Sequence, residues 1–437
     1  MSDVAAAPLG PVWAALGGPE DDLDRLHVTG PAATLSSRFA VTDAGVAAVG
    51  ASLLAASIGT AARVEIDTRA LAVALRSERY LRIDGRSPGS PFDPLSAFHR
   101  TVDGWIRLHA NYPWHRAAAL RVLGCAEADV PAAIADRHAV ELETALHEAG
   151  GVAAAVRAEQ AWRAETGTPP PLVELRDLAP APPRARGRPR VLDLTRVIAG
   201  PVATRTLAAH GADVLRIDAP DRPEIPLQAW DTLPGKRSAL LDLRTDADTL
   251  EELLAGADVV VTGYRPGALD AFGLAPEALA QRHPGLVVVT LSAWGGQGTW
   301  GARRGFDSLV QAACGIALTE GGPDDPGALP AQVLDHATGY LGAAGALLAL
   351  ARQRADGGTP HVRLALAGTA AWLQGLPRTA GPVDVEEVDP AGALVDVSAP
   401  DGVLTIAGPP GRIDGRELSW PAPAPDYGAA VARWSAR

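Results

Sequence analysis

Asp335 is the residue whose type and position most directly suggest chemistry. It stands between a short apolar run, residues 331–334, and a helix that the pattern predicts to continue to about residue 354. That helix carries leucines among alanines and glycines on every face, which is typical of a helix buried by its neighbours. Asp335 is then either an N-cap that accepts hydrogen bonds from free backbone N–H groups, or a nucleophilic carboxylate kept ionised at the helix N-terminus while apolar surroundings raise its pKa.

The elements that would position Asp335 begin at Val191, where short β-branched segments alternate with helical ones. This alternation predicts an α/β fold with a Rossmann-like, doubly wound parallel sheet. Such sheets bind ligands beyond the C-terminal ends of their strands, near the point where the strand order reverses. We therefore expect a ligand site among the loops VIAGP, IDAPDRPE, GYRPGA and SAWGGQG.

The domain organisation follows from length and from one shift in composition. A chain of 437 residues is too long for one ordinary compact core. Residues 177–190 are rich in proline and arginine and lack apolar periodicity, so we predict a linker there. A smaller α+β domain is expected at residues 1–176, the Rossmann-like domain at residues 191–380, and a C-terminal tail packing on the large domain at residues 381–437.

Composition excludes several classes of protein. The formal net charge of −12 argues against a nucleic-acid binder, because neutralising phosphates requires a surplus of lysine and arginine. Cys125 and Cys314 are the only cysteines, which excludes a disulfide framework and a cysteine-based zinc site. The N-terminus lacks the basic region of a signal peptide, and no apolar run reaches the length of a membrane span. We expect a cytoplasmic protein that binds neither membranes nor nucleic acid.

Several common catalytic signatures are missing from the sequence. The first predicted strand leads into VIAGPVAT rather than G-x-G-x-x-G, so the evidence for dinucleotide binding is weak even with Asp218 ending the second strand. Neither G-x-S-x-G nor H-E-x-x-H occurs. The ten histidines are scattered, so we predict no metal site.

Two helix-and-strand segments resemble each other. VGASLLAAS followed by ARVEIDTRALAVAL is similar to AGALLALAR followed by HVRLALAGTAAWL, through either coincidence or duplication. Matching Gly50 to Gly345 places Ala40 opposite Asp335. On that match the first copy lacks the carboxylate.

Six separated motifs carry a family resemblance. They are VLDLTRVIAGPVATRTLAAHGADVLRIDAP, GKRSALLDL, ADVVVTGYRPGAL, LVVVTLSAWGGQG, RRGFDSLVQAACGIA and LDHATGYLGAAGALLAL, in that order between residues 188 and 370. In order and spacing they resemble family III CoA-transferases, the formyl-CoA and carnitine-CoA transferase family. The resemblance implies an enzyme that transfers CoA between an acyl-CoA thioester and a small carboxylic acid through a mixed anhydride on Asp335, the aspartate of the D-x-x-x-G motif.

The resemblance also implies how substrates and subunits are bound. CoA would be a substrate rather than a permanent cofactor, and the protein would be a homodimer. The implied CoA contacts lie in the first turn and after the fourth and fifth strands: Ile198, Ala199, Gly263, Tyr264, Arg265, Ser292, Ala293 and Trp294. Tyr264 and Trp294 would stack on adenine and Arg265 would meet a phosphate, with ordinary loop packing as the alternative for each. The developing oxyanion would need backbone N–H donors, which we expect from a glycine-rich loop.

Other basic residues have weaker assignments. Arg303 and Arg304 are the best candidates for binding a second carboxylate. Lys236 is expected to be a solvated turn residue outside the catalytic set. Ala219 stands where some relatives use an arginine to bind the nucleotide.

The chain departs from the family pattern in ways that leave two alternatives. A segment resembling the family's small domain comes first, and no clear counterpart of the mobile glycine loop of formyl-CoA transferase is found. Related α-methylacyl-CoA racemases use a His and Asp pair, but Phe306 stands at the histidine of their GHD motif. Racemase-like proton transfer and a non-catalytic CoA-binding subunit are the alternative hypotheses.

Overall fold

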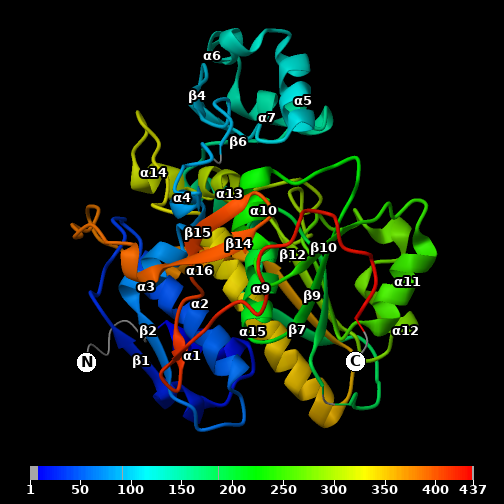
Figure 1. Cartoon of the computed structure of the whole chain (residues 1–437). Helices are drawn as coiled ribbons and strands as arrows, with labels where there is room; N and C mark the ends of the chain where they lie inside the picture. Colours follow the sequence, from blue (N-terminus) through cyan, green and yellow to red (C-terminus); the bar gives the residue numbers. More distant parts are fainter. Residues whose placement is uncertain (1–7, 91, 186, 436–437) are drawn as a thin grey trace.

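The computed structural model describes residues 8–90, 92–185 and 187–435 (Figure 1). Residues 1–7 of the predicted N-terminal domain, residue 186 of the predicted linker and residues 436–437 of the predicted tail lie outside the described residues. Within the described ranges, a seven-stranded sheet forms the centre of the C-terminal half.

This large sheet has the predicted doubly wound topology. In spatial order its strands are β10 (Arg237–Leu240), β9 (Asp213–Asp218), β8 (Arg190–Leu194), β11 (Val259–Thr262), β12 (Val287–Ser292), β13 (Pro360–Ala365) and β7 (Glu174–Asp177). All pairs are parallel except that of β13 with the edge strand β7. Counted along the chain from β8, the parallel strands run 3-2-1-4-5-6, so the strand order reverses between β8 and β11. The predicted fold class is confirmed.

Local sequence explains why these strands are central. Strand β11 is a fully buried run of valines and threonine, and β12 is nearly so, as expected when helices cover both faces of a parallel sheet. The helices that connect the strands include α9 (Ala199–Ala209), α11 (Ala247–Gly256) and α12 (Pro276–Arg282). Proline begins α12 because the first helical position needs no N–H donor.

Helix α15 (Val333–Asp356) is the core helix of the molecule. It packs against α9, against α2 (Val41–Ala56), and against strands β12 and β13. By length and composition it would qualify as a membrane span, but 94% of the qualifying window is buried inside the protein. The small side chains predicted to allow close approach of neighbours are therefore covered by protein.

The N-terminal segment does not form a domain of its own. Helix α2 packs along α15, and α1 (Leu9–Ala15) packs on α2. Buried side chains from residues 9–75 and from the large sheet form one hydrophobic cluster. The predicted division between residues 1–176 and 191–380 is therefore wrong for this segment, because α2 covers an apolar face of α15 that a separate domain would leave open.

A second, smaller core lies within residues 95–155, here called the small unit. Its elements are β4 (Phe98–Arg100), β5 (Trp105–Leu108), β6 (Ala153–Ala155), α5 (Pro113–Leu123), α6 (Val130–Ala135) and α7 (Ala139–Glu148). The three strands form an antiparallel sheet, and the unit projects from the main body at the top of Figure 1. This unit has the α+β character predicted for the N-terminal half.

The C-terminal tail joins segments from both halves of the chain. Strand β15 (Gly402–Ala407) pairs with β14 (Leu394–Ala399) and with β3 (Arg82–Ile83), and β16 (Arg412–Ile413) pairs with β2 (Val64–Asp67). Strand β2 also pairs with β1 (Leu26–Thr29), and β16 with β17 (Arg416–Glu417). The tail therefore contacts the N-terminal segment as well as the large domain.

Short helices complete the described chain. They are α3 (Thr68–Ala74), α4 (Ser77–Tyr80), α8 (Glu159–Thr166), α10 (Pro226–Thr232), α13 (Asp307–Ala313), α14 (Ile316–Glu320) and α16 (Leu366–Gly375). Strand β2 runs directly into α3, and β13 runs directly into α16.

The internal similarity therefore has a structural counterpart with a different register. Both copies have the order helix, strand, helix: α2, β2, α3 and α15, β13, α16. Helix α2 begins at Val41 and α15 at Val333, so Asp43 and Asp335 are both the third residue of their helix. The match of Ala40 to Asp335 is wrong, because it ignores where the two helices begin.

We expect a substitution in α2 to destabilise the whole shared core. Leu54 is fully buried in the common cluster, so Leu54→Ala should lower the free energy of unfolding by about 2–5 kcal/mol. Val140→Ala, at a side chain that is 53% exposed, is the control and should stay within about 0.5 kcal/mol. Urea unfolding followed by circular dichroism and tryptophan fluorescence would measure both. A separate, weaker transition confined to the N-terminal segment would contradict the shared core.

Candidate active site

A cavity of about 560 Å³ lies at the C-terminal ends of the central strands. The loops after β8, β9, β11 and β12 line it, together with the start of α15 and part of the small unit. It opens where the strand order reverses, which is the position at which doubly wound sheets bind ligands.

This cavity brings together Asp335 and most of the predicted CoA contacts. The predicted contacts that line it are Ala199, Gly263, Tyr264, Arg265, Ser292 and Ala293. Ile198 does not line it, because its side chain is buried in the main core. The neighbouring Val197 and Gly200 face the cavity instead.

Trp294 is the other predicted contact that does not line this cavity. Its indole packs against Trp162 and Trp300, with ring centroids 5.5 and 4.6 Å away, and donates its N–H to the carbonyl of Arg304. The predicted stacking of Trp294 on adenine in this cavity is therefore wrong. Gly295 and Gly298, from the glycine-rich segment that follows, line a second cavity of about 580 Å³.

Asp335 is a buried carboxylate without a partner. The helix begins at Val333 with Gln332 as its N-cap, so the interpretation of Asp335 as the N-cap is wrong. Among the described residues, no hydrogen bond reaches its carboxylate, and the residue is 6% exposed, toward the cavity. Burial, with the charges of Asp307 and Glu78, raises the pKa of Asp335 well above its usual value.

Asp307 holds the start of α15 from the neighbouring helix α13. Its Oδ2 accepts the backbone N–H of Asp335 at 2.9 Å, and its Oδ1 accepts the side-chain amide of Gln311. Burial raises the pKa of Asp307 to about 6 despite these hydrogen bonds. Burial therefore disfavours the ionised form of both aspartates, and the charge of Asp307 adds to this effect at Asp335.

His336, next to Asp335 in the sequence, contacts a different residue. His336 is fully buried, and its Nε2 lies 3.5 Å from the Glu78 carboxylate on α4. Burial alone would raise the pKa of Glu78, but the interaction with His336 lowers it below its usual value. Since His336 does not line the cavity, it cannot pair with Asp335 around a bound substrate.

Gly339 explains the glycine of the D-x-x-x-G motif. It lies one turn after Asp335, where α15 crosses α9. A Cβ at this position would lie 2.6 Å from the Ala199 carbonyl oxygen and 2.9 Å from Val202. The glycine therefore allows the first turn of α9, which lines the cavity, to lie directly against α15.

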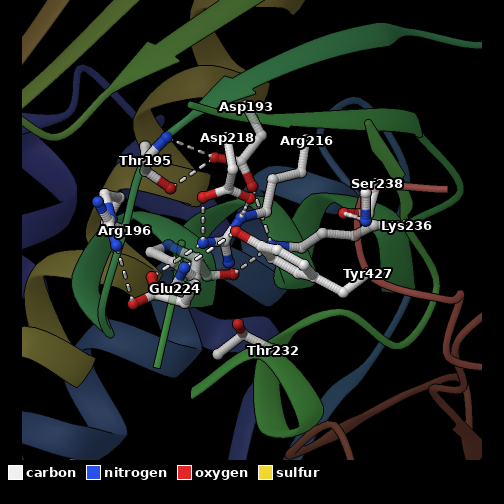
Figure 2. Close-up of polar contacts among 12 residues, drawn as sticks. Asp193, Thr195, Arg196, Arg216, Asp218, Glu224, Thr232, Lys236, Ser238 and Tyr427 are labelled. Carbon is white, nitrogen blue, oxygen red and sulfur yellow. Dashed lines mark hydrogen bonds and ion pairs between the residues drawn. The ribbon is translucent and has the colours of Figure 1, made fainter. Parts of the chain in front are cut away.

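The loop after β8 is strained and is held by a buried carboxylate. Val197 has a φ of 68°, which a β-branched residue adopts only at a cost of about 1–3 kcal/mol. Its N–H donates to Glu224 at 2.9 Å, and Glu224 also accepts from the Tyr112 hydroxyl at 2.5 Å. Glu224 accepts a further hydrogen bond from Arg216 at 2.9 Å (Figure 2). Although burial alone would raise it, the charges of Arg216 and Arg196 hold the pKa of Glu224 below its usual value.

Lys236 belongs to the same buried network rather than to solvent. Its ammonium donates to Asp193 at 3.0 Å (Figure 2). It also donates to the Pro201 carbonyl at 3.0 Å and to the Thr204 hydroxyl at 2.6 Å. The expectation of a solvated turn residue is wrong, because the chain folds this lysine under the start of α9. Burial lowers its pKa to about 8.

Three arginines give the cavity a positive wall. Arg222, Arg265 and Arg304 line it, and within the described part of the chain none of them has a carboxylate partner. Burial and the charges of Arg265 and Arg222 lower the pKa of Arg304. Arg303 differs, because it contacts Glu143 at 3.3 Å and lies over the ring of Trp300.

The small unit contributes residues that our sequence analysis did not assign. Tyr112, Trp114 and His115, from the start of α5, line the cavity. The Arg196 guanidinium lies 4.7 Å from the Tyr112 ring centroid, and that of Arg222 lies 4.7 Å from Trp114. The segment DGWIRLHANYPWHR was recognised as resembling the family's small domain, but nothing in its pattern indicated that it would reach Asp335.

We expect Gly339→Ala to move the first turn of α9 away from α15. The added methyl group meets backbone oxygen rather than a flexible side chain, so the free energy of unfolding should fall by about 1–3 kcal/mol. Gly342→Ala, on the same helix, is the matched control, because its Cβ would make ordinary contacts at 3.5 Å. Denaturant unfolding measures both variants. Equal effects of the two substitutions would contradict the close approach at Gly339.

The raised pKa of Asp307 predicts a pH-dependent stability. The folded protein binds this proton more tightly than the unfolded chain, so the contribution is complete below about pH 4 and is lost as pH rises through about 6. Asp307→Asn cannot titrate, so the parent should lose stability relative to this variant across that range. Urea unfolding of both proteins at several pH values tests this expectation. A difference that does not change with pH would contradict it.

Comparisons with known proteins match the C-terminal half of the chain. Residues 189–405 match the model of CoA-transferase family III. The probable fatty acyl-CoA transferase Rv3272 of Mycobacterium tuberculosis is 33% identical over 201 residues, which are 42% of this chain and 51% of that protein. Succinyl-CoA–D-citramalate CoA-transferase of Chloroflexus aurantiacus is 32% identical over 192 residues, 40% of this chain and 48% of that protein.

A crystal structure of Rv3272 is 34% identical, with 44% of this chain and 58% of that chain covered and a TM-score of 0.41. The chain spans about half the length of the curated relatives it matches. The resemblance to CoA-transferase family III is therefore confirmed over residues 189–405.

Proposed function

We propose that this protein transfers CoA between an acyl-CoA thioester and a small carboxylic acid, with Asp335 as the covalent nucleophile. The observation that carries the proposal is the carboxylate of Asp335, which has no hydrogen-bond partner among the described residues and lies at the wall of a cavity that Arg222, Arg265 and Arg304 also line. The relatives named as acyl-CoA and succinyl-CoA transferases support the same substrate class.

The proposed reaction uses this carboxylate twice. A carboxylate oxygen of Asp335 attacks the thioester carbon, the C–S bond breaks, and CoA leaves as the thiolate. The acceptor carboxylate then displaces the donor carboxylate from the aspartyl anhydride. The thiolate attacks the new acyl carbon, which forms the product thioester and restores Asp335. CoA is a substrate throughout, and the proposal requires no permanent cofactor.

The walls of the cavity suit these substrates. Guanidinium groups bind phosphates and carboxylates, so Arg222 and Arg265 would hold the CoA phosphates and Arg304 the carboxylic acid. Tyr264 is 37% exposed and lines the cavity, where its ring is available to stack on adenine. The homodimer implied by the family resemblance stays a prediction.

Racemase-like proton transfer is less well supported by the same cavity. The histidine that lines it, His115, has a pKa lowered to about 3 by burial and by the charges of Arg304, Arg196 and Arg222. So weak a base would remove an α-proton poorly near neutral pH. Phe306, which lines the cavity beside it, has no titratable group.

The test of this proposal is covalent trapping of the acyl group. The parent protein is incubated with a panel of acyl-CoAs and hydroxylamine, and its intact mass is measured. We expect an Asp335 hydroxamate that is absent from Asp335→Ala. Asp43→Ala is the matched control, because Asp43 is also the third residue of its helix but does not line the cavity, so the adduct should persist.

The other outcomes separate the alternatives. Exchange of the substrate α-proton with deuterated solvent, without an adduct, would favour the racemase hypothesis. Acyl-CoA binding without an adduct or exchange would favour a non-catalytic CoA-binding subunit. Either result would contradict the proposed transfer.

A further inference from the structure

His115 is a buried side chain that has no role in the reaction as proposed above. This residue lies in the first turn of α5, in the small unit, and its side chain lines the cavity of Asp335. It is 5% exposed, and its Nδ1 is buried without a hydrogen-bond partner among the described residues. Nε2 is not among the buried unpartnered atoms, so it is the ring nitrogen accessible from the cavity.

Packing fixes the imidazole in this place. The ring of His115 meets the ring of Phe306 edge to face at 5.9 Å and that of Tyr112 at 5.6 Å. Phe306 immediately precedes Asp307, which accepts the backbone N–H of Asp335. One short path of contacts therefore connects the imidazole to the start of the nucleophile's helix.

The surroundings of His115 select its neutral form and its tautomer. Burial and the nearby charges of Arg304, Arg196 and Arg222 lower the pKa of His115 to about 3, so the ring is neutral at physiological pH. A neutral imidazole has one N–H and one lone pair. Since unpaired buried N–H groups are rarer in proteins than unpaired acceptors, the proton belongs on Nε2.

The proposed reaction requires a hydrogen-bond donor, and this N–H would supply one. Attack on a thioester creates an oxyanion, and its stabilisation requires N–H groups already directed at it. The glycine-rich segment that was expected to provide them lines the second cavity, through Gly295 and Gly298. A neutral histidine is a suitable replacement, since an imidazole N–H can polarise a carbonyl without carrying charge.

We propose that the Nε2–H of His115 donates a hydrogen bond to the thioester carbonyl oxygen and stabilises the oxyanion formed when Asp335 attacks. The inference rests on the proposed transfer reaction. The C–O bond to Asp335 forms, the C–S bond breaks, and the thiolate carries away the electron pair. No proton moves to or from His115 in this step.

The first test compares two phenylalanine substitutions in the same aromatic cluster. His115→Phe keeps a planar ring but removes the N–H. His109→Phe is the matched control: His109 is also buried and stacks on Phe306 at 3.7 Å, but it does not line the cavity. The rate of Asp335 acylation is measured by rapid quench and intact mass, and the Kd for CoA is measured separately.

We expect His115→Phe to slow acylation by about 100- to 1000-fold, the usual effect of losing one oxyanion donor. The Kd for CoA should change less than threefold, and His109→Phe should acylate at the parent rate. The pH dependence of the residual rate should keep its shape, because His115 does not titrate in the working range. Equal acylation rates in the two variants would overturn the inference while leaving covalent transfer intact.

A second measurement does not depend on turnover. Nitrogen-15 NMR of histidine-labelled protein, with His115 assigned through the His115→Phe variant, reports the tautomer directly. We expect a neutral ring with the proton on Nε2 between pH 5 and 9, and a shift of Nε2 when a non-reactive ketone analogue of an acyl-CoA binds. A proton on Nδ1, or a charged ring at pH 7, would overturn the inference even if no donor acylates Asp335.

Discussion

The close packing of α15 against α2, α9 and β13 is the constraint on which the rest of the structure depends. Glycines at the contacts leave no room for side chains: a Cβ at Gly345 would lie 2.6 Å from Val362, and one at Gly339 would lie 2.6 Å from the Ala199 oxygen. A carboxylate at the start of such a helix is largely removed from water, and this burial raises the pKa of Asp335. No hydrogen bond from the described residues holds its oxygens. The same packing therefore builds the core and sets the chemistry of Asp335.

A buried charge network then fixes the opposite wall of the cavity. Glu224 joins the strained Val197 of the β8 loop, Arg216 of β9 and Tyr112 of the small unit. Removing one partner from such a network would leave a buried charge uncompensated, which is strongly destabilising in other proteins. Glu224 therefore couples the docking of the small unit to the backbone conformation that opens the cavity.

Much of the catalytic half was predictable because its signals are local. β-branched runs separated by turns indicated the doubly wound sheet, and the loops after its strands contain most of the observed lining. The errors arose where distant segments meet. Val197 rather than Ile198 lines the cavity, at a positive φ. Trp294 packs against the distant Trp162, and Lys236 donates to the distant Asp193. His115 was missed because its place at the cavity depends on how the small unit packs against the main body. Hydrophobic periodicity along the sequence does not indicate that packing.

The pairing of α2 with α15 within one chain also bears on how this sequence can change. When two copies of one chain form a symmetric pair of helices, every substitution changes both helices. Here the matching helices are encoded separately, so α2 is free to vary on its own. Asp43, in the position that corresponds to Asp335, lines no part of the cavity, and its helix leads into β2, in a small sheet beside the large one. One helix of the pair can therefore be selected for packing alone while the other is selected for chemistry.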